Sequence, residues 1–196
     1  MVISITISAL IIGGSSYFIL KTNSETQTAK NRTKIHTEMS AFIEKVNYLR
    51  GNYSTGSILI DHMYGYDTLV LTNSGQTSGV LIGVVNLASL DTNEGAKLDP
   101  LASFSTYNNK VIGIQELTNS QLASVLSVPS NAYNITFQSD RYYSGLQAER
   151  FSAITYNSGS LIELDIGIYE RPLDFLMGQS ISTVLEETVL PFNLVF

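Results

Sequence analysis

The sequence opens with MVISITISALIIGGSSYFIL (residues 1–20), and this stretch decides how the whole chain is organised. The first charged residue is Lys21. A helix of twenty residues is about 30 Å long, which is the thickness of the hydrocarbon core of a bilayer. Large apolar side chains favour insertion of this stretch by roughly 3–6 kcal/mol, so we expect a membrane-inserted helix. These side chains are Val2, Ile3, Ile5, Ile7, Leu10, Ile11, Ile12, Phe18, Ile19 and Leu20.

Two other interpretations of residues 1–20 are open. A cleaved signal peptide needs a basic segment before the apolar run, and no Lys or Arg precedes it. A buried helix of a soluble domain is seldom apolar on all sides over this length. Within the run, Gly13 and Gly14 mark a point at which the helix loosens or another helix approaches closely.

A second helical pattern follows. Residues 21–33 (KTNSETQTAKNRT) are polar and aperiodic, which fits either helix or a short linker. Apolar residues then recur at spacings of four and three, which predicts a stripe along one helix face that packs on the rest of the protein. The stripe consists of Ile35, Met39, Phe42, Val46 and Leu49. No proline interrupts residues 1–50, and Gly51 is suited to a C-cap. One continuous helix of about 50 residues and ~75 Å is therefore expected over residues 1–50.

Residues 51–196 are expected to form a β-rich head. Segments rich in β-branched residues predict strands, and they cover residues 57–61, 68–72, 80–87, 110–115, 134–138, 151–156 and 160–169. In the last segment, alternation predicts one buried and one solvated face. Residues 89–100 read as a polar loop, and residues 118–126 and 180–187 as short helices. The apolar end, residues 190–196, is expected in a sheet or an interface.

Composition and charge narrow the classes of partner. Charged residues make up 14% of the chain, below the usual quarter, and there is no cysteine. Residues 1–50 carry six basic and three acidic residues, a net charge of +3, whereas the remainder carries five and fourteen, a net charge of −9. An acidic head without basic stripes argues against nucleic acid. The opposite signs of the two parts favour attraction between copies of the chain.

No catalytic motif emerges, so we expect no enzymatic activity. Neither His36 nor His62 has metal-ligand spacing or a recognisable partner for a catalytic triad. Glu163 and Asp165 point the same way from one predicted strand, and adjacent acids on a wet face usually serve solvation rather than catalysis.

One loop has oxygen ligands at short spacing, with Gly95 available for a sharp turn. It does not follow the EF-hand pattern, so no cofactor is expected and calcium is the minor alternative. The candidate ligands are Asp91, Asn93, Glu94 and Asp99.

Residues 1–50 resemble the N-terminal helix of type IV pilins and of type II secretion pseudopilins. MVISITISALIIGGSSY is similar to the later part of the family's N-terminal motif, which passes through a Met-Val-Val-Ile-like run and ends near Ser-Tyr. The basic leader, the N-terminal Phe and the early Glu of that motif are not part of this sequence, in which no acidic residue occurs before Glu25. Either the sequence starts inside the motif or the protein is not processed as a pilin.

The resemblance implies an α+β fold in which a long helix packs on an antiparallel β-rich head. It also implies a pool of subunits in the inner membrane of a prokaryote, followed by assembly into a filament at the cell surface. In such a filament residues 1–20 form the core with copies of the same helix.

Two rival functions are open: a single-span, membrane-anchored binding domain outside the cytoplasm that does not polymerise, and an anchored hydrolase of unrecognised type. Lys21, Lys30, Arg32 and Lys34 follow the apolar run and taken alone would place the head in the cytoplasm, whereas a basic leader upstream would reverse that orientation.

Overall fold

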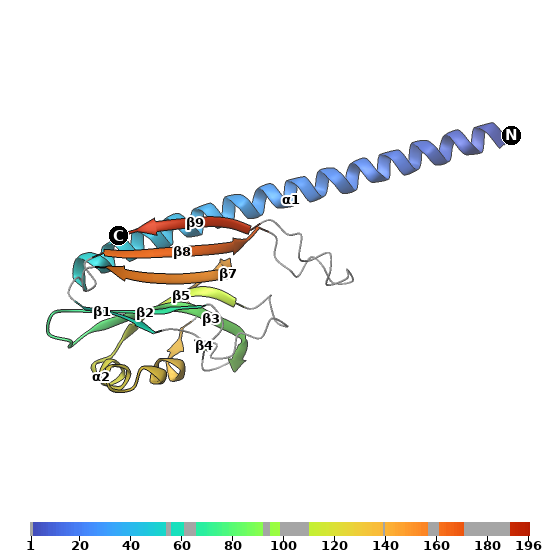
Figure 1. Ribbon diagram of the computed structural model, residues 1–196. Helices are drawn as coiled ribbons and strands as arrows, with labels where there is room; N and C mark the ends of the chain where they lie inside the picture. The colour runs from blue at the N-terminus through green and yellow to red at the C-terminus, as the bar shows by residue number, and fades with distance from the viewer. Residues whose placement is uncertain are drawn as a thin grey trace.

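A long helix lying against an antiparallel sheet is the main feature of the computed structural model (Figure 1). The structure describes residues 2–53, 56–60, 66–91, 95–98, 110–138, 140–156, 161–170 and 189–196, with the side chains of residues 2–13, 56–60 and 88–91 outside the description. The α+β class expected from the sequence is confirmed.

The helix, α1, runs without a break over Val2–Asn52. The polar residues 21–33 are therefore helix and not a linker. The predicted C-cap at Gly51 is wrong, because the helix continues through this residue, and Gly95 is the glycine with positive φ among the described residues. The amide of Tyr53 still donates to the carbonyl of Leu49 over 2.8 Å, which completes the last turn.

The strands form one extended antiparallel arrangement in the order β1-β2-β3-β5-β7-β8-β9, with β4 paired to β3 and β6 paired to β4. Their bounds are β1 Gly56–Ile60, β2 Thr68–Thr72, β3 Gly79–Asp91, β4 Gly95–Leu98, β5 Lys110–Leu117, β6 Thr136–Phe137, β7 Tyr142–Tyr156, β8 Leu161–Tyr169 and β9 Val189–Val195. In Figure 1, α1 lies beside β7, β8 and β9, and the short helix α2 lies on the far side of the sheet.

The middle strands are continuous apolar runs in the sequence because their two faces pack into two different apolar clusters. In β2, Leu69 and Leu71 join the cluster that contains the stripe of α1, whereas Val70 joins the cluster beneath α2. In β3, Ile82 and Leu81 divide in the same way. Because both faces of these strands are covered, every residue of β2 is buried.

The layer on the far face consists of α2 (Asn119–Ser127) and a 3-10 helix, η2 (Pro129–Asn134). Thr118 caps α2, and Gln121 completes a capping box with it. Leu122 and Val125 of α2 are buried on the sheet.

Residues 89–100 differ most from the prediction. The expected polar loop is wrong for residues 89–91 and 95–98, because β3 continues to Asp91 and β4 (Gly95–Leu98) pairs with it and with β6. Gly95 has a φ of +80°, and a Cβ there would collide with the carbonyl oxygen of Phe137. The polar side chains of this segment resemble those of a loop, so the sequence pattern does not predict a strand. Strand pairing uses only backbone groups, which are the same for every side chain.

The remaining strand predictions are mostly confirmed. Residues 68–72 match β2, and β8 shows the expected alternation, with Ile162, Leu164, Ile166 and Ile168 buried. In contrast, β7 begins at Tyr142, nine residues before the predicted start at residue 151. The apolar end of the chain forms β9 beside β8. The predicted helix over residues 180–187 lies outside the described residues.

Candidate functional site

The part of α1 toward the N-terminus projects beyond the head (Figure 1). From residue 14 to residue 34, every side chain is exposed or half-buried. Four consecutive large apolar side chains lie in it, and their exposed fractions are 70% for Tyr17, 69% for Phe18, 57% for Ile19 and 69% for Leu20. At about 100° of rotation per residue, four consecutive positions reach all sides of a helix.

The residues predicted to form a membrane or filament-core helix divide into two groups. Gly14, Phe18, Ile19 and Leu20 are described and exposed. The others belong to α1, but their side chains lie outside the described residues, and these are Val2, Ile3, Ile5, Ile7, Leu10, Ile11, Ile12 and Gly13. Within the part of the chain that the structure describes, no helix reaches the length and apolarity needed to cross a membrane.

The other half of α1 is seated on the sheet through its apolar stripe. The exposed fractions of these side chains are all 3% or less, and the residues are Ile35, Met39, Phe42, Val46 and Leu49. They join one cluster with residues of β2, β3, β5, β7 and β8. The rings of Phe42 and Tyr143 meet edge to face, with centroids 5.7 Å apart and planes at 89°, which is a favoured aromatic geometry.

Polar contacts that the sequence did not reveal fix the helix where it leaves the head. Oε2 of Glu38 accepts the backbone N–H of Gly145 over 2.7 Å, and Nζ of Lys34 donates to Oγ of Ser144 over 3.2 Å. Arg32 forms an ion pair with Glu170, whose side chain is 4% exposed. These residues lie off the apolar stripe, and their partners are more than 100 residues away in sequence, so no local pattern pairs them.

A pocket of about 260 Å³ lies beside these contacts, between α1 and the strands β7 and β8. Its polar lining includes Asn31, Lys34, Gln147 and Glu170. Oε1 of Gln147 is buried and has no hydrogen-bond partner among the described residues. The lining thus combines charged groups of both signs with the Gln147 side chain.

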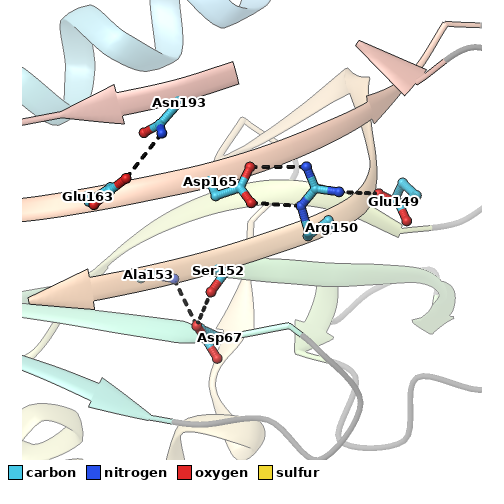
Figure 2. Close-up of polar contacts among 8 residues, drawn as sticks. All are labelled: Asp67, Glu149, Arg150, Ser152, Ala153, Glu163, Asp165 and Asn193. Atoms are coloured by element: carbon cyan, nitrogen blue, oxygen red, sulfur yellow. Dashed lines mark hydrogen bonds and ion pairs between the residues drawn. The ribbon is translucent and has the colours of Figure 1, made fainter. Parts of the chain in front are cut away.

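The face of β7, β8 and β9 that points away from α1 carries a row of polar contacts (Figure 2). Nε and an Nη of Arg150 donate to the two carboxylate oxygens of Asp165 over 2.9 and 3.1 Å. This bidentate hydrogen bond makes the largest contribution to the raised pKa of the Arg150 guanidinium. The Glu163 carboxylate accepts from the hydroxyl of Tyr156 over 3.0 Å and from the amide of Asn193 over 3.1 Å.

Glu163 and Asp165, which share one face of β8, each have their own hydrogen-bond partners. The hydrogen bond to Glu163 also raises the pKa of Tyr156 above the ordinary value of 10.0, because the charged carboxylate favours the protonated phenol.

Only some of the other residues considered for chemistry are among the described residues. His36 is exposed on α1 and meets the ring of Phe192 edge to face at 6.0 Å, and His62 lies outside the described residues. Asp91 ends β3, whereas Asn93, Glu94 and Asp99, the remaining candidate calcium ligands, lie outside the description. Among the described residues no three His, Asp or Glu side chains are grouped to hold a metal.

Comparisons of the chain with models of protein families, with curated proteins and with solved structures find no match.

Proposed function

We propose that this chain is the structural subunit of a type IV pilus-like filament, with residues 1–20 in the filament core and the β-rich head outside. The observation that carries the proposal is the exposure of Tyr17, Phe18, Ile19 and Leu20 on the projecting half of α1. Exposed apolar groups in such a cluster mark a surface that another apolar medium covers.

The all-round distribution of these side chains favours an environment that covers every side of the helix. A single partner surface buries one face of a helix and leaves the others in water. A bilayer or a bundle of several like helices surrounds the helix completely. Residues 1–20 contain no charged residue. A helix of twenty residues is about 30 Å long, which suits both environments in succession.

Assembly in this proposal moves the helix from lipid to a bundle. Because lipid tails are as apolar as the helix, the gain on assembly comes from close packing, which small residues permit. Gly14 meets this need, since, apart from its two chain neighbours and the nearby backbone of its own helix, no atom of the described residues lies within 4 Å of the place a Cβ would take. A contact between two different surfaces, repeated along an axis, produces an open helical filament.

A second candidate is a membrane-anchored binding domain outside the cytoplasm that remains a monomer. The polar pocket between α1 and β7 favours it, because its lining includes Gln147, whose buried Oε1 has no hydrogen-bond partner among the described residues. This candidate and the filament share the anchor and the absence of enzymatic chemistry, and they differ in whether copies associate.

Electron microscopy of material sheared from the surface of the producing cells tests the proposal. We expect thin filaments that an antibody against the head decorates along their length. Finding the protein only as dispersed, membrane-bound monomers would refute the filament and favour the binding domain. The coding sequence upstream of residue 1 is a second check, since a short basic leader ending in Gly before Phe-Thr-Leu-Ile-Glu supports a pilin.

A further inference from the structure

The exposed apolar side chains of the head gather at one place. Among its described residues, five large apolar side chains are substantially exposed: Val128, Ile154, Tyr156, Leu161 and Val195. All except Val128 lie where β7 ends, β8 begins and β9 ends. Their exposed fractions range from 38% to 62%, so this corner of the sheet is open to a partner.

The register of the strands places these side chains on one face around a carboxylate. Ile154 lies opposite Glu163, and Glu163 lies opposite Val195 on its other side. Tyr156 and Leu161 form the neighbouring pair on the same face. We call Ile154, Tyr156, Leu161, Glu163 and Val195 the outer patch.

The Glu163 carboxylate is held in place but not neutralised. Its partners, the Tyr156 hydroxyl and the Asn193 amide, are neutral donors, and within the described residues it forms no ion pair. Asp165 on the same strand differs, because Arg150 binds both of its oxygens. A fixed carboxylate surrounded by apolar side chains is complementary to a positively charged side chain that is itself flanked by apolar side chains.

The free half of α1 carries a surface of that kind. Lys21 shares a helix face with Tyr17 and Phe18, which lie four and three residues before it. All three side chains are exposed, and no ion pair of Lys21 occurs among the described residues. The net charges also match, since residues 1–50 carry +3 and the remainder carries −9.

The two surfaces cannot meet within one molecule. Lys21 lies on the projecting half of α1, whereas Val195 is next to the C-terminus, at the opposite end of the molecule from the N-terminus (Figure 1). We propose that the outer patch of one subunit binds the Lys21 face of α1 of a second copy of the chain, through the Glu163 carboxylate. Such a contact joins different surfaces and can therefore propagate along an axis. The inference rests on the proposed function, because it names one contact between neighbouring subunits of that filament.

Zero-length cross-linking of the full-length protein tests this contact. A water-soluble carbodiimide is applied to sheared surface material and to membranes, and cross-linked peptides are identified by mass spectrometry. We expect an amide bond between Lys21 and Glu163 in a species of twice the subunit mass. Lys21→Glu and Glu163→Lys should each lower its yield at least tenfold, and the double reversal should restore a cross-link between the same two positions.

Matched charge reversals control for net charge. Lys30 is nine residues from Lys21, half a turn away around the helix axis, so Lys30→Glu should leave the cross-link intact. Asp140, whose side chain is 69% exposed, provides Asp140→Lys as the control for Glu163→Lys. Circular dichroism verifies that each variant folds.

The outcomes separate this contact from the filament itself. Filaments without a Lys21–Glu163 cross-link, or an equal loss in Lys30→Glu and Lys21→Glu, would overturn the contact and leave the filament standing. A cross-link from Glu163 to a different protein would overturn it as well. If the Lys21–Glu163 cross-link is found in dimers from the membrane fraction and the cells make no filaments, the contact is supported and the filament is refuted.

Discussion

Glu38 of α1 accepts a hydrogen bond from the backbone N–H of Gly145 in β7, with 2.7 Å between Oε2 and N. The contact works because residue 145 has no side chain. A Cβ there would lie 2.9 Å from Oε1 of Glu38 and 3.0 Å from Cε of Lys34. A helix carboxylate and a strand backbone, 107 residues apart in sequence, thereby set the position of α1 on the head.

Gly145→Ala should therefore weaken the attachment of α1 to the sheet. The added methyl group forces the ends of Glu38 and Lys34 to move, and the hydrogen bond lengthens. We expect a loss of about 1 kcal/mol in the free energy of unfolding, measured by urea denaturation of the full chain in mild detergent. Gly75→Ala is the control, because its nearest neighbour would be 3.7 Å away. Equal losses in both variants would argue against the contact.

Phe42→Ala should be the most damaging change in α1. The ring is fully buried and packs edge to face on Tyr143, so its removal leaves a cavity and costs about 3–5 kcal/mol. Tyr48 is 65% exposed on the same helix, and Tyr48→Ala should cost less than about 0.5 kcal/mol. The same denaturation experiment compares them. A small effect of Phe42→Ala would mean that the stripe does not hold α1 on the sheet.

Asp67 connects two distant parts of the sheet and should be sensitive to truncation. Its Oδ2 accepts the N–H of Ala153 over 2.8 Å and the hydroxyl of Ser152 over 3.0 Å (Figure 2). Asp67→Ala leaves these donors without a partner, and we expect a cost of about 1–3 kcal/mol. Asp67→Asn keeps an acceptor oxygen and should cost less. Thermal unfolding followed by circular dichroism distinguishes the two, and the reverse order would contradict this role.

Alkaline pH should destabilise the packing of α1 on the sheet, because Tyr143 ionises. Burial is the main cause that raises the pKa of Tyr143 above the ordinary value of 10.0, and the negative charge of Glu38 raises it further. The folded protein therefore disfavours ionised Tyr143, and the stability that this residue contributes is complete below pH 10 and is lost as the pH rises through the raised pKa. Tyr143→Phe keeps the ring but removes the phenol, so its stability should fall less across this range.

Melting temperatures measured between pH 9 and pH 12 test the effect of Tyr143. Tyr48→Phe, at an exposed position, is the matched control and should follow the unmodified protein. A Tyr143→Phe curve that runs parallel to both would show that ionisation of Tyr143 does not contribute.

Gly14→Leu separates assembly from membrane insertion. Apart from the two chain neighbours and the nearby backbone of α1, no atom of the described residues lies within 4 Å of a Cβ at residue 14. Leucine should therefore fit the isolated subunit, and its apolar side chain favours insertion. In the proposed filament it would push neighbouring helices apart. We expect normal amounts in the membrane fraction and a strongly reduced yield of sheared filaments. A normal filament yield would show that close packing at this position is not required.

The local patterns in the sequence determined much of the fold. The spacing of Ile35, Met39, Phe42, Val46 and Leu49 predicts the buried face of α1 because a helix repeats every 3.6 residues, wherever that face is later placed. The alternation in residues 160–169 predicts the two faces of β8 for the same kind of reason. Thr118 at the start of α2 is recognisable because capping involves only residues within one turn.

Only the tertiary structure decided which segments meet. Residues 89–91 belong to β3 and residues 95–98 form β4 because backbone groups, which no side-chain pattern reports, pair between these two strands and with β6. Glu38 finds Gly145, and Glu163 gains its ring of apolar neighbours, because strands distant in sequence come into register. A local pattern specifies which face of an element is apolar, but the partner of that face depends on packing of the whole chain.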